Sequence, residues 1–411
     1  METRIIEALE KDNPWWKARF EIGFKPRDIY QEIKKFMHTR QIISLTGLRR
    51  TGKTTIMMKL VQDSLEKFGK NSIIYFSFDE FTEARIMDII NSYCRMLNKD
   101  LKKGKYLMLF DEIQKISGWE EQLKRIYDQN ENIKIIISGS ESLFIRKKSR
   151  ESLAGRMYEF EIKALSFREY LIFKSIKFDN LLLYKEDILK ELNHFLLTNG
   201  FPEIINEGKE IIEKYLKNNV IEKIIYRDIS QIFSIREPAI LEQILSIILK
   251  SPGEMINLDN ISGELGVSRQ TISLYLDYLE KSFLVKKIYN FSKSPRKTQR
   301  RLKKYYPTIL MPDVIDKQEL FGKIFETFIV KELNAEFFWR DAQKNEVDII
   351  KLSGSLILPI EIKTKNIDYG PINLFVKHFK LDKGIVITYD SKENNGKIEA
   401  IPFYEYLLSA H

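Results

Sequence analysis

The chain has 411 residues, more than one ordinary hydrophobic core accommodates, so its length predicts two to four domains. Hydrophobic residues make up 44% of it and aromatic residues 12%, which excludes a disordered or low-complexity chain. The net charge of +9 suits a polyanionic partner, although a lysine-rich proteome produces the same excess without one.

Cysteine and histidine are too sparse for a structural scaffold. Cys94 is the single cysteine and the four histidines are scattered, which excludes a disulfide framework and a zinc finger. No apolar run approaches the roughly 18 residues of a membrane-spanning helix, and the N-terminus is charged where a secretory signal is apolar. We therefore expect a cytoplasmic protein with no membrane association.

Residues 41–69 form the most informative segment, an apolar strand followed by a glycine-bracketed loop and an amphipathic helix. Its loop fits the pattern G-x-x-x-x-G-K-[ST], in which glycines let backbone N–H groups surround an anion at the positive end of a helix. Lys53 is expected to reach the β- and γ-phosphates of ATP, and the Thr54 hydroxyl to ligate Mg²⁺. The expected contacts to ATP or ADP are Gly47, Leu48, Arg49, Arg50, Thr51, Gly52, Lys53, Thr54 and Thr55.

A second acidic strand complements this loop. The stretch KYLMLFDEIQ ends an apolar run in Asp111 and Glu112, which predicts that Asp111 binds Mg²⁺ and that Glu112 polarises the attacking water. Two further apolar strands alternate with helical stretches, as in a parallel sheet with helices on both faces. Ser138 and Ser140 end the later of these strands, where they either contact the γ-phosphate or are ordinary turn serines.

Several motifs then occur in the order typical of a large group of archaeal and bacterial AAA+-like ATPases, which the chain resembles over nearly its whole length. They are GLRRTGKTT, LMLFDEIQKISGWEEQLKRIYD, IISGSES, LAGR and LSFREYL. The resemblance implies that Arg156 of LAGR senses the γ-phosphate or acts as an arginine finger, although an arginine after glycine is equally a structural cap. It also implies that the segment NPWW, residues 13–16, packs against the ATPase core.

The middle of the chain has the spacing of a helix-turn-helix. A short helix ends at Gly266, Ser268 caps a second helix, and a strand then opens a wing. If the motif reads DNA, Arg269, Gln270 and Ser273 face the groove.

The wing, residues 293–304, holds seven basic residues and no acidic one. It either contacts phosphates or is a solvated loop, and because winged helices also bind proteins, DNA and protein partners are both expected classes. The expected phosphate contacts are Arg296, Lys297, Arg300 and Arg301.

The last part of the chain is similar to the PD-(D/E)XK nuclease-like core, which the family named above carries. Glu361 and Lys363 lie two residues apart on an apolar strand, so both side chains project to one face. The similarity implies that Asp348 and Glu361 share Mg²⁺, that Lys363 orients water or stabilises charge, and that Glu326 adds a carboxylate from a helix. The alternative is a structural ion pair at a strand edge, and the proline that opens the motif in many nucleases is missing.

The predicted fold class is a multidomain α/β chain that begins with a P-loop NTPase sheet and ends in a restriction-endonuclease-like domain. The predicted function is a Mg²⁺-dependent ATPase that processes or docks to DNA. The alternative is a regulatory switch ATPase whose C-terminal domains bind proteins on a degenerate nuclease fold, and a homo-oligomer or a protein partner fits either. The predicted parts are an N-terminal segment (1–35), the ATPase domain (36–165), a helical region (166–245), the winged helix (246–310) and the nuclease-like domain (311–411).

Overall fold

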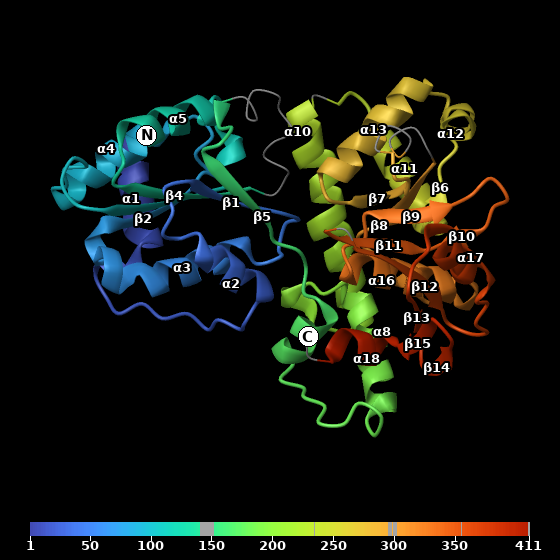
Figure 1. Ribbon diagram of the computed structural model, residues 1–411. Helices are drawn as coiled ribbons and strands as arrows, with labels where there is room; N and C mark the ends of the chain where they lie inside the picture. The colour runs from blue at the N-terminus through green and yellow to red at the C-terminus, as the bar shows by residue number, and fades with distance from the viewer. Residues whose placement is uncertain (140–151, 234, 295–297, 299–301, 355, 410–411) are drawn as a thin grey trace. The chain divides into compact units, whose positions relative to one another are not determined.

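The computed structural model describes residues 1–139, 152–233, 235–294, 298, 302–354 and 356–409. The chain divides into two compact units, Met1–Ala164 and Leu165–His411, and each is described by itself (Figure 1). The finer division into five parts stays a prediction.

The first unit is built on a parallel sheet of five strands in the order β2-β3-β4-β1-β5. Every pairing in it is parallel, and β1, β3 and β4 are buried along their whole length, as strands covered on both faces are. The strands are β1 (Ile42–Thr46), β2 (Ile73–Ser77), β3 (Tyr106–Asp111), β4 (Ile133–Ser138) and β5 (Met157–Glu161).

Helices cover both faces of this sheet, with α4 and α5 above it and α2 and α3 below it in Figure 1. The predicted parallel sheet between helices is confirmed, and the arrangement fits a P-loop NTPase fold. The helices are α1 (Glu2–Asp12), α2 (Asp28–Lys35), α3 (Lys53–Phe68), α4 (Ile86–Leu97) and α5 (Trp119–Gln129).

The NPWW segment packs on the edge strand β2, as expected. Trp15 and Trp16 both lie in the core of the unit, and each indole N–H donates to the carbonyl oxygen of Ile73, at 3.2 and 2.8 Å. The buried Asn13 side chain bonds the backbone of Tyr75, two residues further along the same edge strand. The N-terminal segment therefore satisfies backbone groups that an edge strand leaves unpaired.

The second unit begins with a helical region, as its sequence pattern predicts. Two consecutive stretches of it are π-helical, an uncommon geometry that widens the turn. The elements are α7 (Phe167–Phe173), α8 (Lys185–Thr198), α9 (Lys209–Lys214), the π-helices η5 (Tyr215–Ile221) and η6 (Lys223–Ile229), and α10 (Ser230–Phe233).

The expected helix-turn-helix spacing follows. Gly266 ends α12 with a positive φ of 66°, and the Ser268 hydroxyl accepts a hydrogen bond from the Thr271 N–H at 3.1 Å, which caps α13. Strand β8 pairs antiparallel with both β6 and β7. The elements are α11 (Pro238–Lys250), β6 (Glu254–Met255), α12 (Leu258–Leu265), α13 (Arg269–Lys281), β7 (Val285–Asn290) and β8 (Lys303–Pro307).

Two sheets complete the second unit, and a polar side chain lies where the chain passes from one sheet to the other. One sheet has the order β10-β9-β7-β8-β6 and the other β11-β12-β13-β15-β14, so Asp348, between β10 and β11, stands where the chain passes from one sheet to the other. The elements are α15 (Pro312–Ile315), α16 (Phe321–Glu332), β9 (Phe337–Arg340), β10 (Glu346–Val347), β11 (Ile349–Ser353), β12 (Leu356–Lys363), α17 (Gly370–Phe379), β13 (Gly384–Thr388), β14 (Glu393–Asn395), β15 (Ile398–Pro402) and α18 (Phe403–Leu408).

Candidate functional site

The glycine-bracketed loop joins the end of β1 to the start of α3. Gly47 has φ 132°, and a Cβ there would meet the carbonyl oxygen of Ile162 at 2.3 Å, so only glycine fits. Gly52 has φ 98° and stands immediately before Lys53, the first residue of α3. The loop therefore has the strand-loop-helix setting that phosphate binding at a helix N-terminus requires.

Lys53 folds back over its own loop. Its Nζ donates to the carbonyl oxygens of Gly47 at 3.0 Å and Leu48 at 2.8 Å, and the side chain is buried. These contacts hold the ammonium at the loop where the β- and γ-phosphates of a nucleotide are expected.

Asp111, at the end of β3, collects donors from four residues. Its Oδ2 accepts hydrogen bonds from the Thr54 hydroxyl at 2.7 Å and the Tyr75 hydroxyl at 2.8 Å. Its Oδ1 accepts from the Ser138 hydroxyl and from the Glu112 N–H, the latter at 3.1 Å. The structure thus brings the two predicted magnesium ligands into direct contact and places Ser138 beside them, whereas Ser140 lies outside the described residues.

Tyr75 is a member of this cluster that the sequence reasoning missed. The phenol hydroxyl within the buried strand IIYFS was the available signal, because β2 and β3 are adjacent and parallel. The pairing places Ser77 beside Asp111, so Tyr75 lies two residues earlier on the neighbouring strand.

Glu112 adopts a left-handed backbone conformation, with φ 52°, as the first residue past β3. Its Oε2 accepts a hydrogen bond from the Gln114 side chain at 2.6 Å. Burial raises the pKa of Glu112 above its usual value, with Lys53 opposing and Asp111 adding to the rise. A carboxylate with a raised pKa is a better proton acceptor near neutral pH, which suits the predicted role.

Arg156 lies at the other end of the sheet from the nucleotide loop. Met157, the first residue of β5, pairs with Ile42, the first residue of β1, so Arg156 lies just before the end at which these two parallel strands begin. The nucleotide loop follows the last residue of β1, at the opposite end. Five strand residues at about 3.3 Å each separate the two ends. The Arg156 guanidinium instead pairs with the Asp128 carboxylate at 2.9 and 3.2 Å. In the structure Arg156 is an ion-pair partner, and its expected role as a γ-phosphate sensor or arginine finger stays a prediction.

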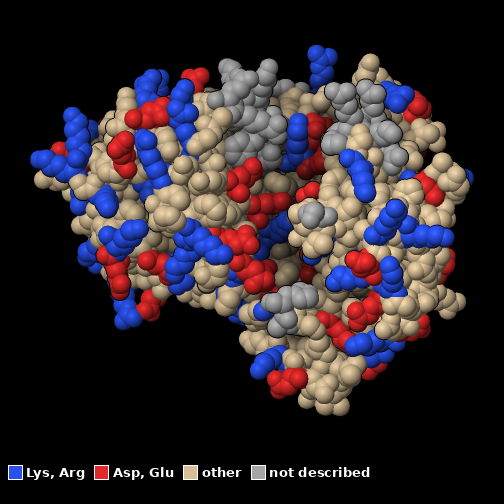
Figure 2. All heavy atoms as spheres, in the orientation of Figure 1, with Lys and Arg blue, Asp and Glu red and all other residues tan. Residues whose placement is uncertain are grey.

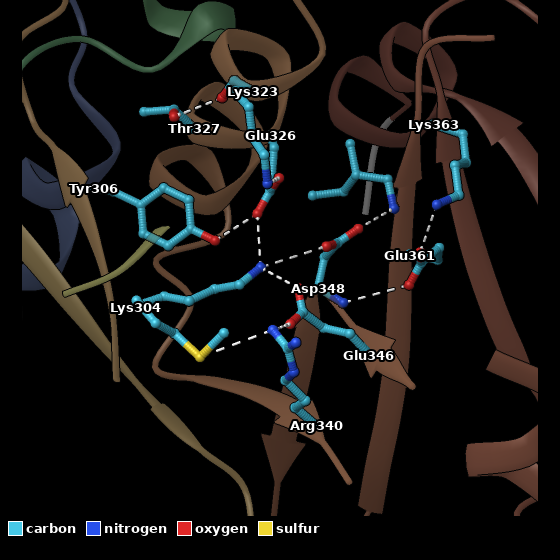
Figure 3. A network of polar contacts seen from close by, with 12 residues as sticks. Lys304, Tyr306, Lys323, Glu326, Thr327, Arg340, Glu346, Asp348, Glu361 and Lys363 are labelled. Carbon is cyan, nitrogen blue, oxygen red and sulfur yellow. Dashed lines mark hydrogen bonds and ion pairs between the residues drawn. The ribbon is translucent and has the colours of Figure 1, made fainter. Parts of the chain in front are cut away.

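In the second unit, the predicted trio of Asp348, Glu361 and Lys363 comes together as the sequence spacing suggests (Figure 3). Asp348 Oδ2 accepts from the Ile362 N–H at 2.9 Å, and the Asp348 N–H donates to Glu361 Oε2 at 3.4 Å. Lys363 Nζ donates to Glu361 Oε1 at 2.8 Å, which is the strand-edge ion pair that the alternative reading expects.

Glu326 is held by other partners than a metal. Its Oε1 accepts from the Tyr306 hydroxyl at 2.6 Å and from Lys304 Nζ at 3.1 Å, and its Oε2 from Lys323 Nζ at 3.1 Å. Lys304 also pairs with Glu346 at 2.6 Å and lies 3.8 Å from an Asp348 oxygen (Figure 3). In the structure Glu326 is an ion-pair partner, and its expected role of adding a carboxylate to a metal site stays a prediction.

Lys304 was expected to belong to the exposed basic wing, and that expectation is wrong. Its side chain is 3% exposed and extends from β8 toward three carboxylates. Lys304 and Tyr306 are two residues apart on β8, so both side chains project to the same face, and both reach Glu326. This period-2 pairing was the sequence signal for a buried role.

The carboxylates of this cluster have shifted pKa values. Burial raises the pKa of Asp348 to about 6, with Glu326 adding to the rise. Burial raises the pKa of Glu361 to about 8, with the negative charge of Asp348 adding to it. For Glu326 burial acts in the same sense, but Lys304 and Lys323 outweigh it and lower the pKa. Asp348 and Glu361 therefore form a crowded pair, in which each carboxylate lies buried beside other negative charge. The charge of Glu326 is instead neutralised by its two lysines.

A pocket of about 590 Å³ opens over this cluster. Four lysines and five carboxylates line it, so that cations are available for a phosphate-bearing ligand and carboxylates for a cation between Asp348 and Glu361. Among the described residues, no three or more His, Cys, Asp or Glu side chains are arranged to hold a metal ion. The lining lysines are Lys323, Lys344, Lys363 and Lys365, and the lining carboxylates are Glu319, Glu326, Glu346, Asp348 and Glu361.

The expected DNA-reading face of α13 is exposed, with Arg269, Gln270 and Ser273 all on the surface. Arg269 pairs with Asp259 at 3.4 Å, so the face is not uniformly basic. Figure 2 shows Lys and Arg side chains interspersed with Asp and Glu over the visible face of the second unit. The four wing cations expected to contact phosphates, Arg296, Lys297, Arg300 and Arg301, lie outside the described residues.

Comparisons with known proteins agree with the nucleotide loop and leave the second unit without an assigned activity. Residues 39–171 match the family model of an AAA domain. Two further matches are to domains of unknown function, DUF8612 over residues 189–308 and DUF4143 over residues 321–406. The AAA-domain match covers the loop, Asp111 and Ser138.

Relatives span nearly the whole chain. It is 28% identical to an uncharacterized protein of Methanocaldococcus jannaschii, over 98% of this chain and 95% of that protein. It is 26% identical to a second uncharacterized protein of the same organism, over 95% and 89%, and 25% identical to one of Haemophilus influenzae, over 92% and 97%. The combination of all these parts in one chain therefore recurs in both archaea and bacteria.

Solved structures add little. The match to C. elegans PCH-2 has a TM-score of 0.25 and 13% identity, over 80% of this chain and 67% of that chain. The match to the Pif1 helicase from Candida albicans has a TM-score of 0.27 and 10% identity, over 44% and 46%. Likenesses at these TM-scores carry no argument about this chain.

No helix in the described part of the chain is long and apolar enough to span a membrane.

Proposed function

We propose that the first unit binds ATP with Mg²⁺ and hydrolyses it. The observation that carries the proposal is the direct contact between Thr54 and Asp111 beside the glycine loop, at 2.7 Å. Two oxygen-bearing side chains that meet at the loop are the pair that a P-loop uses to hold the metal. Mg²⁺, when bound, neutralises charge on the β- and γ-phosphate oxygens.

The chain's own groups account for the remaining roles. Lys53 exchanges its two loop carbonyl contacts for phosphate oxygens, and the N–H groups at the start of α3 face the same anion. Glu112 accepts a proton from the attacking water, for which its raised pKa is suited. Ser138, in contact with Asp111, keeps that carboxylate oriented.

The test is ATP turnover and nucleotide binding by the full chain. Lys53→Ala is expected to abolish binding of a fluorescent ATP analogue, because it removes the cation of the loop. Glu112→Gln is expected to retain binding and to lower kcat by at least about 100-fold, the usual worth of a general base. Glu83→Gln changes an exposed carboxylate of the same unit and serves as the control. Wild-type turnover in Glu112→Gln would reject the assignment of the base.

We propose as a second function that the pocket of the second unit binds a phosphodiester of a nucleic acid, with a divalent cation between Asp348 and Glu361. The supporting observation is a pocket of about 590 Å³ with four lysines around a crowded carboxylate pair. Lys363 lies beside the pair, where its ammonium can stabilise charge on a phosphate.

Calorimetric titration of Mn²⁺ into the full chain tests this second function, in an Asp111→Asn background that removes the nucleotide site. One bound ion is expected, lost in Asp348→Asn and in Glu361→Gln and kept in the exposed control Glu336→Gln. Nicking of DNA that requires the metal and Lys363 would establish cleavage, and metal binding without nicking would leave a docking site. No bound ion, with early melting of both variants, would make the trio a structural ion cluster.

The alternative function, a switch ATPase whose second unit binds proteins, is separated by one measurement. ATP turnover is compared with and without DNA over a range of salt concentrations. Stimulation that weakens steeply with salt favours the nucleic-acid reading, because release of counterions drives phosphate binding. Turnover that DNA leaves unchanged favours a protein partner.

A further inference from the structure

We propose that Tyr75 is a positioning residue of the nucleotide site and that Asn13 of the N-terminal segment holds it in place. The proposal rests on the ATPase function proposed above and assigns that site a determinant outside its loop and its acidic strand. Tyr75 orients the carboxylate of Asp111, and through it the binding of Mg²⁺.

The first step of the argument is the hydrogen bonding of Asp111. Its Oδ2 accepts from Thr54 at 2.7 Å and from Tyr75 at 2.8 Å. When the Thr54 hydroxyl turns to a metal ion, the Tyr75 hydroxyl is the donor left on that oxygen, with Ser138 and the Glu112 N–H on the other. Tyr75 therefore fixes which lone pairs Asp111 presents to the metal or to its bound water.

The second step is the character of the Tyr75 hydroxyl. The side chain is buried, and the ordinary pKa of a tyrosine hydroxyl, about 10, lies well above physiological pH. The hydroxyl thus keeps its proton at physiological pH and acts as a donor to Asp111, not as a competing ligand.

The third step is the attachment of Tyr75 to the N-terminal segment. Asn13 Oδ1 accepts from the Tyr75 N–H at 2.7 Å, and Asn13 Nδ2 donates to the Tyr75 carbonyl oxygen at 2.9 Å. The same Nδ2 donates to the Leu9 carbonyl oxygen at 2.9 Å, at the end of α1. Because β2 is the edge strand of the sheet, the Asn13 side chain makes the backbone hydrogen bonds that a neighbouring strand makes elsewhere in the sheet.

Tyr75→Phe tests the proposal because it removes only the hydroxyl. The full chain is titrated with Mg²⁺ at a fixed concentration of a fluorescent ADP analogue, and ATP turnover is measured in parallel. The Mg²⁺ concentration for half-maximal binding is expected to rise about tenfold, the effect of losing one hydrogen bond to a charged group. Nucleotide affinity in EDTA is expected to stay unchanged, and kcat to fall more than KM rises.

Tyr30→Phe is the matched control, since Tyr30 donates a hydrogen bond of 2.8 Å to Asp63 in the same unit, away from the loop. Its Mg²⁺ requirement should equal that of the wild type. Asn13→Asp keeps an acceptor for the Tyr75 N–H and removes the donor to its carbonyl, so it should shift the Mg²⁺ requirement in the same direction as Tyr75→Phe.

An unchanged Mg²⁺ requirement in Tyr75→Phe would overturn the proposal, even if the variant melts earlier, because a structural role alone lowers stability without changing half-saturation by metal. An unchanged requirement in Asn13→Asp would remove Asn13 from it. A wild-type chain that binds nucleotide without hydrolysing it would refute the ATPase function, while the Mg²⁺ titration would still decide the role of Tyr75.

Discussion

Lys304 and Lys323 both pair with Glu326 at 3.1 Å, yet their surroundings differ sharply. The Lys304 side chain is 3% exposed, whereas that of Lys323 is 43% exposed. A buried ammonium that neutralises several carboxylates cannot be removed without leaving their charge uncompensated, whereas an exposed one is replaced by water.

Lys304→Met is therefore expected to destabilise the protein by about 3–5 kcal/mol, and Lys323→Met by about 0–1 kcal/mol. Urea unfolding of both variants beside the wild type measures the difference. Addition of Mn²⁺ should restore part of the stability of Lys304→Met alone, since a divalent cation can replace the missing ammonium. Equal losses in the two variants would contradict the view that burial decides the effect.

The crowded pair of Asp348 and Glu361 predicts a pH dependence. Their folded-state pKa values, about 6 and about 8, lie above the values of about 3.9 and 4.3 for the unfolded chain. The folded state therefore binds protons more tightly, so this contribution to stability is complete below about pH 4 and is lost as the pH rises through about 8.

Hydrogen exchange of the peptide covering residues 346–363, in buffer with a chelator, measures this local effect. Protection in the wild type should fall between pH 5.5 and pH 8.5, after correction for the intrinsic exchange rate, and should change less in Glu361→Gln. Parallel changes in both proteins would show that the two carboxylates do not titrate in this range.

At the scale of elements, strand β8 links the two features of the second unit to which we assign the proposed binding of phosphates. Its residues Lys304 and Tyr306 reach the carboxylate cluster, and the basic segment of residues 293–302 immediately precedes it in the chain. The exposed N-terminal face of α13 adds Arg269, which Asp259 partly neutralises. Phosphate affinity is therefore expected to come mainly from the wing.

Replacement of the four wing cations by alanine tests this expectation. The variant Arg296→Ala, Lys297→Ala, Arg300→Ala, Arg301→Ala should bind all DNA sequences more weakly and flatten the salt dependence by up to about four units, near one per lost contact. Arg269→Ala, as the comparison, should flatten it by at most one unit. A salt dependence that the fourfold variant leaves unchanged would make the wing a solvated loop.

Elements whose signals are local were predicted well. The strand, loop and helix around Lys53 agree with the sequence pattern because glycine conformations and helical periodicity act over a few residues. The same holds for Gly266 and Ser268, which end one helix and cap the next. The place of Arg156 at one end of the sheet was not predictable in this way, because a motif locates a residue along the chain only.

At the scale of the whole molecule, the two units differ in what can be said of their function. The first unit has a fold that fits a P-loop NTPase, for which we propose ATP hydrolysis, whereas the second consists mostly of domains with no assigned function. The sheet that holds β7 and β8 continues into β9 and β10, so the strand pair that follows α13 and a strand beside the carboxylate pocket belong to one sheet. The buried core around Tyr306 and Phe325 likewise joins residues of β7, β8 and α16 to residues of β11, β12 and β13. Changes in the wing are therefore expected to reach the pocket through β8.

Patterns along the chain were enough to predict the nucleotide loop, the acidic strand, the parallel sheet and the proximity of Asp348, Glu361 and Lys363, because each depends on spacing within one or two elements. The folded structure was needed to show that Tyr75 bonds Asp111, that Asn13 closes the edge of β2, and that Lys304 neutralises Glu326. Those contacts join residues between 22 and 62 positions apart, and no local periodicity encodes which distant donor a buried carboxylate meets. The physical reason is that a buried charge must find a partner, while the packing of separate elements selects that partner.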